Sequence, residues 1–136
     1  MRPTFDRVIP LLVYRDIQAA HDFLVNAFGF DSGGVERAAD GQVVHAEVRV
    51  GSTPLWLHRV TSEHELSSPA TGGIAAAGLV VYVSDVDQHY VQARKAGAQI
   101  DSQPVDQPYG QREYGARDPE GHRWWFATPV VNAQPT

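Results

Sequence analysis

The feature that most constrains the fold of this chain is an order of elements that occurs twice along it. The first occurrence opens with residues 8–14, an apolar run of strand length. Asp16 follows and is placed to cap a helix predicted over residues 17–28, where apolar residues recur at helical spacing. Gly29 is placed to end that helix. The order is therefore strand, capping aspartate, helix and terminating glycine.

The same order returns in the second half of the chain. Residues 78–84 form the apolar run, Asp85 is the cap, and the helix is predicted over residues 86–96. Gly97 then ends the helix. Because the type and order of the elements agree, we expect two copies of one structural unit.

Each predicted helix is followed by three strand-like runs that turn signals separate. These runs are about 35–39, 43–50 and 54–60 in the first half, and about 99–103, 112–117 and 122–128 in the second. Residues 61–77 are rich in Ser, Gly, Ala and Pro and lack any period, so they are predicted to be a linker. We expect a single α+β domain over 1–136, with βαβββ modules at about 7–60 and about 78–130.

One helix in each module covers only one face of a four-stranded sheet. The other faces are therefore expected to form a concave mixed sheet without a helical cover. Small-molecule sites are concave and lie where elements meet, so function is expected on that surface.

Composition excludes several classes of protein. The chain has no cysteine, which rules out disulfides, thiol catalysis and Cys-based metal sites. A net charge of -5, without clustered Lys and Arg, argues against a nucleic-acid partner. No apolar run is long enough to span a bilayer, and none precedes Asp6 as in a signal peptide. We expect a cytoplasmic protein that binds neither nucleic acid nor membrane.

Two segments carry a resemblance to a known family. Residues 11–29, and residues 109–126 with the turn Asp-Pro-Glu-Gly-His at 118–122, resemble the glyoxalase/bleomycin-resistance/extradiol-dioxygenase superfamily, also called vicinal oxygen chelate proteins. The resemblance extends over roughly 7–130. It implies paired βαβββ modules and a homodimer whose sites use strands of both chains.

The resemblance also implies where a metal would lie, since side chains on the first and last strands of each module hold it in that superfamily. Counted from the capping aspartates, the matching positions here are Ile9, Trp56, Gly78 and Trp125. None of these side chains can donate to a divalent cation. The resemblance therefore points to the metal-free branch, whose members bind and sequester antibiotics. We expect no metal, no other cofactor, and neither glyoxalase nor dioxygenase activity.

Strand alternation directs one set of side chains toward the uncovered face, where we predict a small planar or aromatic ligand. This set comprises Ile9, Trp56, His58, Gly78, Tyr82 and Trp125. The indole rings would stack on the ligand, and Gly78 would leave room for a ring of the ligand. Tyr109 lies on a loop that could close over it. The alternative is that these aromatic side chains fill the hollow as core.

Polar residues on the third strand of each module suggest a second hypothesis. His45 and Glu47 share one strand face in the first module, and Arg112 and Tyr114 share one in the second. An acid–base pair among them would support a metal-free isomerase, cyclase or lyase in the same cleft. Two further hypotheses remain: a metal-dependent enzyme of the superfamily, and a structural dimer without a ligand. Binding or sequestration is the leading hypothesis, and catalysis is left open.

Overall fold

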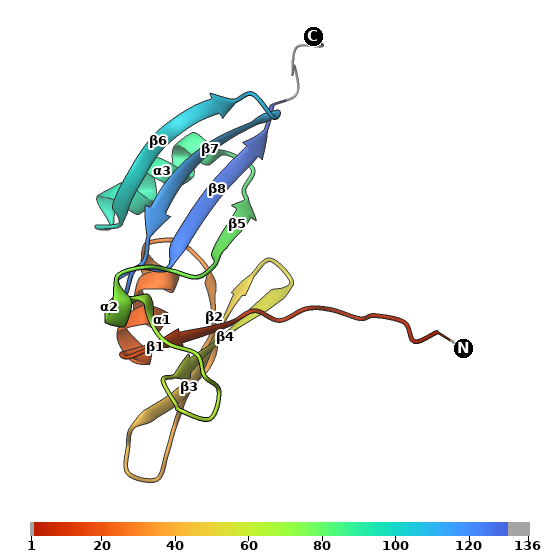
Figure 1. Cartoon of the computed structure of the whole chain (residues 1–136). Coiled ribbons are helices and arrows are strands. Elements are labelled where there is room, and N and C mark those ends of the chain that lie inside the picture. Colours follow the sequence, from red (N-terminus) through yellow and green to blue (C-terminus); the bar gives the residue numbers. More distant parts are fainter. Residues whose placement is uncertain (1, 131–136) are drawn as a thin grey trace.

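The computed structural model describes residues 2–130 and contains two four-stranded sheets (Figure 1). The first module comprises β1 (Leu11–Tyr14), α1 (Ile17–Asn26), β2 (Asp31–Arg37), β3 (Val43–Val50) and β4 (Thr53–Arg59). The second comprises β5 (Gly78–Tyr82), α3 (Val86–Lys95), β6 (Gln99–Gln107), β7 (Gln111–Arg117) and β8 (Arg123–Pro129). The predicted α+β class and repeated βαβββ order are confirmed. The linker contains the short helix α2 (Pro69–Gly72), which the sequence analysis did not predict.

Both sheets have the same mixed topology. Their strand orders are β1-β4-β3-β2 and β5-β8-β7-β6, and the first and last strands of each module pair in parallel. The other neighbouring strands are antiparallel. A parallel pair needs a crossover connection, which explains why the helix directly follows the first strand of each module.

Local chemistry fixes the start of each helix. The carboxylate of Asp16 accepts a hydrogen bond from Ala19 N at 3.0 Å, and that of Asp85 accepts one from Gln88 N at 3.1 Å. Each bond satisfies an amide of the first turn that has no partner within the helix. Both predicted caps are therefore confirmed.

The core lies between the helices and the sheets and is continuous from one module to the other. Phe28, just after α1, packs edge-on against Trp124 and Phe126 of β8, with ring centroids 5.5 Å and 4.8 Å away. The carbonyl of Phe28 also accepts a hydrogen bond from His89 Nε2 on α3 at 2.8 Å. The end of α1 is thus built into the core of the second module.

The turn between β7 and β8 makes the second connection between the modules. Buried Asp118 accepts hydrogen bonds from Tyr14 OH on β1 at 2.5 Å and from Trp124 Nε1 at 3.1 Å. It also accepts from the backbone amides of Glu120 and His122. Burial, followed by the adjacent Asp118 carboxylate, raises the pKa of Tyr14 well above its usual value, so the hydroxyl remains a donor.

Neighbouring residues of the same turn extend this connection. Glu120 accepts hydrogen bonds from the backbone amides of Arg15 at 2.7 Å and Asp16 at 2.8 Å. His122 Nε2 donates to the carbonyl of Val13 at 2.9 Å. The turn that carried the family resemblance therefore holds the end of β1 and the start of α1.

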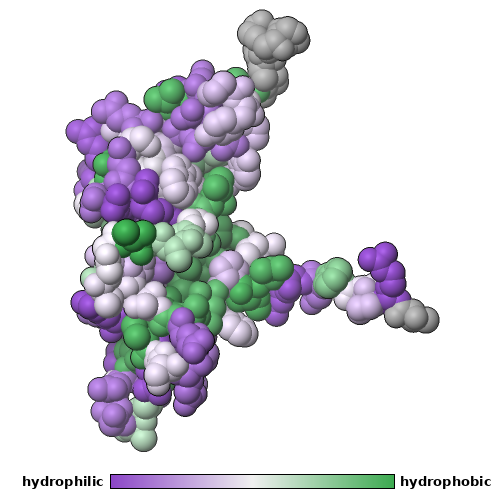
Figure 2. Space-filling model, in the orientation of Figure 1, coloured by the Kyte–Doolittle hydropathy of each residue, from purple (hydrophilic) through white to green (hydrophobic). Residues whose placement is uncertain are grey.

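Helices α1 and α3 lie on the same side of the molecule, and the N-terminal arm extends from the other side (Figure 1). Figure 2 shows apolar side chains gathered near the middle of the molecule, where that arm meets the body. Within residues 2–130, no helix has both the length and the apolar character needed to cross a membrane.

Candidate ligand-binding site

The uncovered sheet faces present the two tryptophans selected from the sequence. Leu57 of β4 and Phe126 of β8 are fully buried on the helix side. Alternation along each strand then directs Trp56 and Trp125 to the opposite faces. Trp56 is 39% exposed and Trp125 is half-buried, so neither ring is enclosed in the core.

Trp125 lies across its own sheet, and two glycines make this possible. A Cβ atom on Gly78 of β5 would overlap the six-membered ring of the indole, and one on Gly115 of β7 would lie 3.2 Å from Nε1. The Arg123 guanidinium carbon lies 5.0 Å from the ring centroid. The space left by Gly78 is therefore filled by Trp125 itself, which corrects the prediction that a ring of the ligand would lie there.

Trp56 is oriented by a carboxylate. Its Nε1 donates to Glu47 Oε1 at 3.0 Å, and the other oxygen of Glu47 lies 3.1 Å from Arg49 NH2. A hollow of about 250 Å³ opens beside this group, lined by Arg7, Ile9, Glu47, Arg49, Ser52, Pro54 and Trp56. Ile9 and Trp56 thus line the same hollow. The hydrogen bonds of the described residues include none from Trp125 Nε1, which leaves that donor available to a ligand.

His45 and His58 lie side by side on β3 and β4, with ring centroids 6.5 Å apart. The His45 ring meets Trp56 edge-on at 5.7 Å. Glu47 bonds Trp56 and Arg49, and within residues 2–130 it makes no hydrogen bond to His45. Glu47 therefore orients the indole of Trp56, and His45 and Glu47 do not form an acid–base pair.

The prediction that Arg112 and Tyr114 share the cleft is wrong. Tyr114 pairs with Phe126 in the register of β7 and β8, which places its side chain on the helix side at 0% exposure. Its OH lies 2.7 Å from His89 Nδ1. Burial raises the pKa of Tyr114 and lowers that of His89, so Tyr114 donates to a neutral imidazole.

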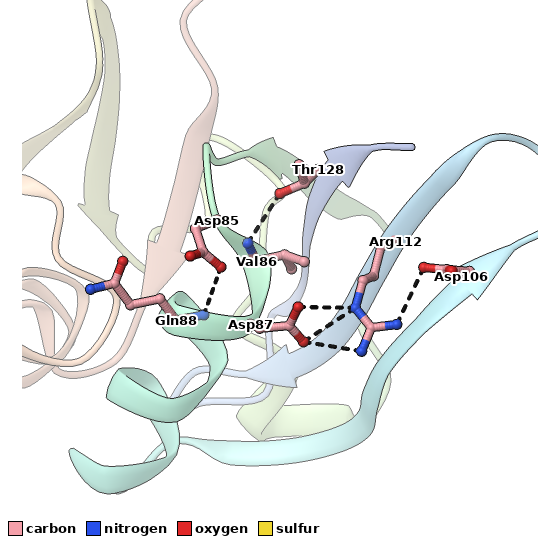
Figure 3. Close-up of polar contacts among 7 residues, drawn as sticks. All are labelled: Asp85, Val86, Asp87, Gln88, Asp106, Arg112 and Thr128. Atoms are coloured by element: carbon pink, nitrogen blue, oxygen red, sulfur yellow. Dashed lines mark hydrogen bonds and ion pairs between the residues drawn. The ribbon is translucent and has the colours of Figure 1, made fainter. Parts of the chain in front are cut away.

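Arg112 is held on the same side of the sheet by two aspartates (Figure 3). Its Nε lies 3.1 Å from Asp87 Oδ2 on α3, and its NH1 lies 3.2 Å from Asp106 Oδ1 on β6. The Asp87 hydrogen bond, followed by that of Asp106, raises the pKa of Arg112. Arg112 of β7 therefore connects α3 with β6 on the helix side of the sheet, and it does not face the cleft.

Gln111 and Glu113 of β7 lie on the uncovered face, and neither was selected from the sequence. Glu113 pairs with Ala127 of β8 and is only 9% exposed. Tyr109 OH donates to its carboxylate, and Gln111 Nε2 donates at 3.3 Å. Tyr82 OH in turn donates to Gln111 Oε1 at 2.6 Å. This network brings together Tyr82 and Tyr109, both predicted ligand contacts.

The four positions implied for a metal do not fit one. Trp125 covers the backbone at Gly78, and Trp56 uses its only polar atom to donate to Glu47. Within the described part of the chain, no group of three or more His, Cys, Asp or Glu side chains is arranged to hold a metal ion. These residues therefore support no metal-dependent step.

Comparison with known proteins identifies relatives over nearly the whole chain. A model of the Glyoxalase/Bleomycin resistance protein/Dioxygenase superfamily matches residues 4–126. The uncharacterized protein Mb0911c of Mycobacterium bovis is 30% identical over 125 residues, which cover 89% of this chain and 82% of that protein.

Solved structures agree with this fold. TioX from Micromonospora sp. ML1 is 31% identical, with 93% of this chain and 100% of that chain covered and a TM-score of 0.73. TnmS3, an antibiotic binding protein from Streptomyces sp. CB03234, is 19% identical with a TM-score of 0.72 over 95% and 100% of the chains. The bleomycin-binding protein of Streptomyces verticillus, complexed with copper(II)-bleomycin, is 22% identical with a TM-score of 0.64 over 92% and 97%.

Proposed function

This chain belongs to the glyoxalase/bleomycin resistance protein/dioxygenase superfamily, and from that premise we propose that it binds or sequesters a small planar ligand such as an antibiotic. The observation that carries the proposal is the pair of accessible indole rings at matching positions of the two modules, where donors for a metal are absent. Two proteins of similar fold are an antibiotic binding protein and a bleomycin-binding protein, which supports this choice.

The proposed contacts divide by chemistry. Trp56 and Trp125 supply planar faces for stacking, and the free Nε1 of Trp125 can donate to a carbonyl of the ligand. Around these rings, the predicted contacts are Ile9, His58, Tyr82 and Tyr109. The indole of Trp125 packs against the backbone at Gly78. We do not assign a catalytic role to His45 or Glu47, because the carboxylate is engaged by Trp56 and Arg49.

Titration with a panel of planar antibiotics is expected to quench tryptophan fluorescence saturably. For a ligand found in this way, Trp125→Ala is expected to weaken binding by about 2 kcal/mol, roughly thirtyfold in Kd, because buried tryptophans dominate binding energies. Trp125→Phe keeps a planar face and is the matched control, with a much smaller loss. Isothermal calorimetry provides the Kd values. The absence of saturable binding across the panel, or equal affinity of Trp125→Ala and wild type, would contradict the proposal.

We further propose that two copies of the chain associate through the middle of the molecule. Figure 2 shows apolar side chains gathered there. Leu11, Leu66 and Ile74 line one hollow of this region, and Val80 and Tyr82 line a second hollow that shares Pro10 and Leu79 with it; all five side chains are exposed. A hollow of about 660 Å³ lies between the linker and the first strands of both modules. Contiguous apolar surface of this kind typically marks an interface, and a second copy would cover it and close the ligand-binding faces.

Light scattering at micromolar concentration is expected to give twice the mass of the chain. Val80→Glu places a charge in the apolar surface and is expected to yield monomers, since an unpaired buried charge is costly. Val91→Glu introduces the same charge on the exposed side of α3 and should leave the mass unchanged. A monomeric wild type would refute the proposed association.

A further inference from the structure

We propose that Glu113 receives a cationic amine of the ligand, so that the protein selects planar aromatic compounds that carry a protonated amine. This inference rests on the proposed binding function and adds a charge requirement to it. It is carried by three observations on the uncovered face of the second module: the position of the carboxylate, its lack of a cationic partner, and the aromatic rings around it.

Glu113 lies on the same face as Trp125. In the register of the second sheet, Glu113 of β7 and Tyr82 of β5 both stand beside Ala127 of β8. The side chain of Gln111 bridges these two residues: its Oε1 accepts from Tyr82 OH at 2.6 Å, and its Nε2 donates to Glu113 Oε1 at 3.3 Å. Trp125 precedes Ala127 by two residues on β8 and therefore shares its face. Glu113 and the indole thus belong to one continuous surface.

The charge of Glu113 is not balanced by a neighbouring cation. Among the described residues, the ion pairs do not include Glu113, whereas Glu47 is paired with Arg49 and Asp101 with Arg117 and Arg123. Its hydrogen-bond donors are neutral groups, the Tyr109 hydroxyl and the Gln111 amide. Both donors reach Oε1, and no hydrogen bond from the described residues reaches Oε2.

Such an environment favours a bound cation. Glu113 is only 9% exposed as a residue, and its Oε2 is open to a partner, so an ammonium group can form a charge-assisted hydrogen bond there. Tyr109, at 66% exposure, donates to the carboxylate directly, and Tyr82, at 62% exposure, is linked to it through Gln111. The faces of phenol rings attract cations, so they add to the attraction of Glu113.

The geometry also sets the spacing within the ligand. Glu113 stands opposite Ala127, which is two residues after Trp125 on β8. Two residues along a strand span about 7 Å of backbone. A ligand that stacks on the indole and also reaches the carboxylate therefore needs a spacer between its planar ring system and its amine. A short alkyl spacer provides this distance.

The test compares naphthylethylamine with naphthylethanol, which share the ring and spacer and differ in charge. Binding of each is followed by NMR chemical-shift titration of the wild-type protein at neutral pH. The amine is expected to bind about tenfold more tightly, as a charge-assisted hydrogen bond of this kind provides. Glu113→Gln is expected to abolish this preference and retain naphthylethanol binding. Glu63→Gln removes the same charge from the exposed linker and should keep the preference.

Each outcome bears on a different claim. Equal binding of amine and alcohol by the wild-type protein, or an unchanged preference in folded Glu113→Gln, refutes the role of Glu113 and leaves the binding function intact. Failure of both probes to bind contradicts the amine site, while the antibiotic panel decides the binding function separately. The wild-type comparison needs no variant, so a Glu113→Gln protein that does not fold leaves the test decisive.

Discussion

Asp118→Ala is expected to lower the free energy of unfolding by about 3–5 kcal/mol, because buried donors lose an acceptor that water cannot replace. Tyr14 OH and Trp124 Nε1 both donate to this carboxylate from buried positions. The backbone amides of Glu120 and His122 lose the same acceptor, so the turn itself loses its internal support. Since domains of this size are stable by about 5–15 kcal/mol, this loss is a large fraction of the total stability.

Urea denaturation followed by circular dichroism measures this loss. Asp31→Ala, at an exposed position of β2, is the matched control and should change stability by less than about 0.5 kcal/mol. Combined with Tyr14→Phe, Asp118→Ala should show a coupling energy of about 1–3 kcal/mol, because the two residues share one hydrogen bond. Additive effects would show that this bond does not hold the modules together.

Phe28→Ala is expected to destabilise the protein by about 3–5 kcal/mol, the usual cost of deleting a buried phenyl ring. Phe28 is nearly fully buried and contacts rings of both modules, among them Phe23, Phe126 and Trp124. Its backbone carbonyl would still accept from His89, so the loss would report packing rather than hydrogen bonding. The cavity would lie where α1 enters the second module.

The same denaturation experiment tests this effect. Val91→Ala shortens an exposed side chain on α3 and should have little effect, since no packed neighbour is lost. If Phe28→Ala cost no more than Val91→Ala, the continuous core between the modules would be contradicted. A transition that splits into two steps would instead indicate that the modules unfold separately once Phe28 is removed.

Elements with strong local signals could be predicted from the sequence. β3 is observed at Val43–Val50, as its alternation predicts, because alternate apolar residues are buried on the helix side. The capping aspartates set the starts of α1 and α3. α1 ends at Asn26, two residues earlier than predicted, and β6 extends to Gln107 instead of ending near 103. Where a helix or strand ends depends on its partner strand and on the path of the following chain. Neither is encoded in the residues of the element itself.

The candidate site was predicted less completely, and β7 shows why. Its residues Gln111–Arg117 carry polar side chains on both faces, so alternation alone does not say which face is buried. Pairing with β8 decides this: Tyr114 lies beside Phe126 in the core, and Glu113 faces outward beside Ala127. The prediction about Arg112 and Tyr114 was therefore wrong, and Glu113 was missed.

By itself, the sequence determined the repeated βαβββ order, the helix caps and the absence of metal donors at the matching positions. These properties depend on residue type and short spacing, which persist whatever the rest of the chain does. Only the tertiary structure decided that Trp125 rests on Gly78 and Gly115, and that Asp118 binds Tyr14, 104 positions away. Such contacts depend on strand register and on how the two modules pack, because residues far apart in sequence meet only when the whole chain is folded.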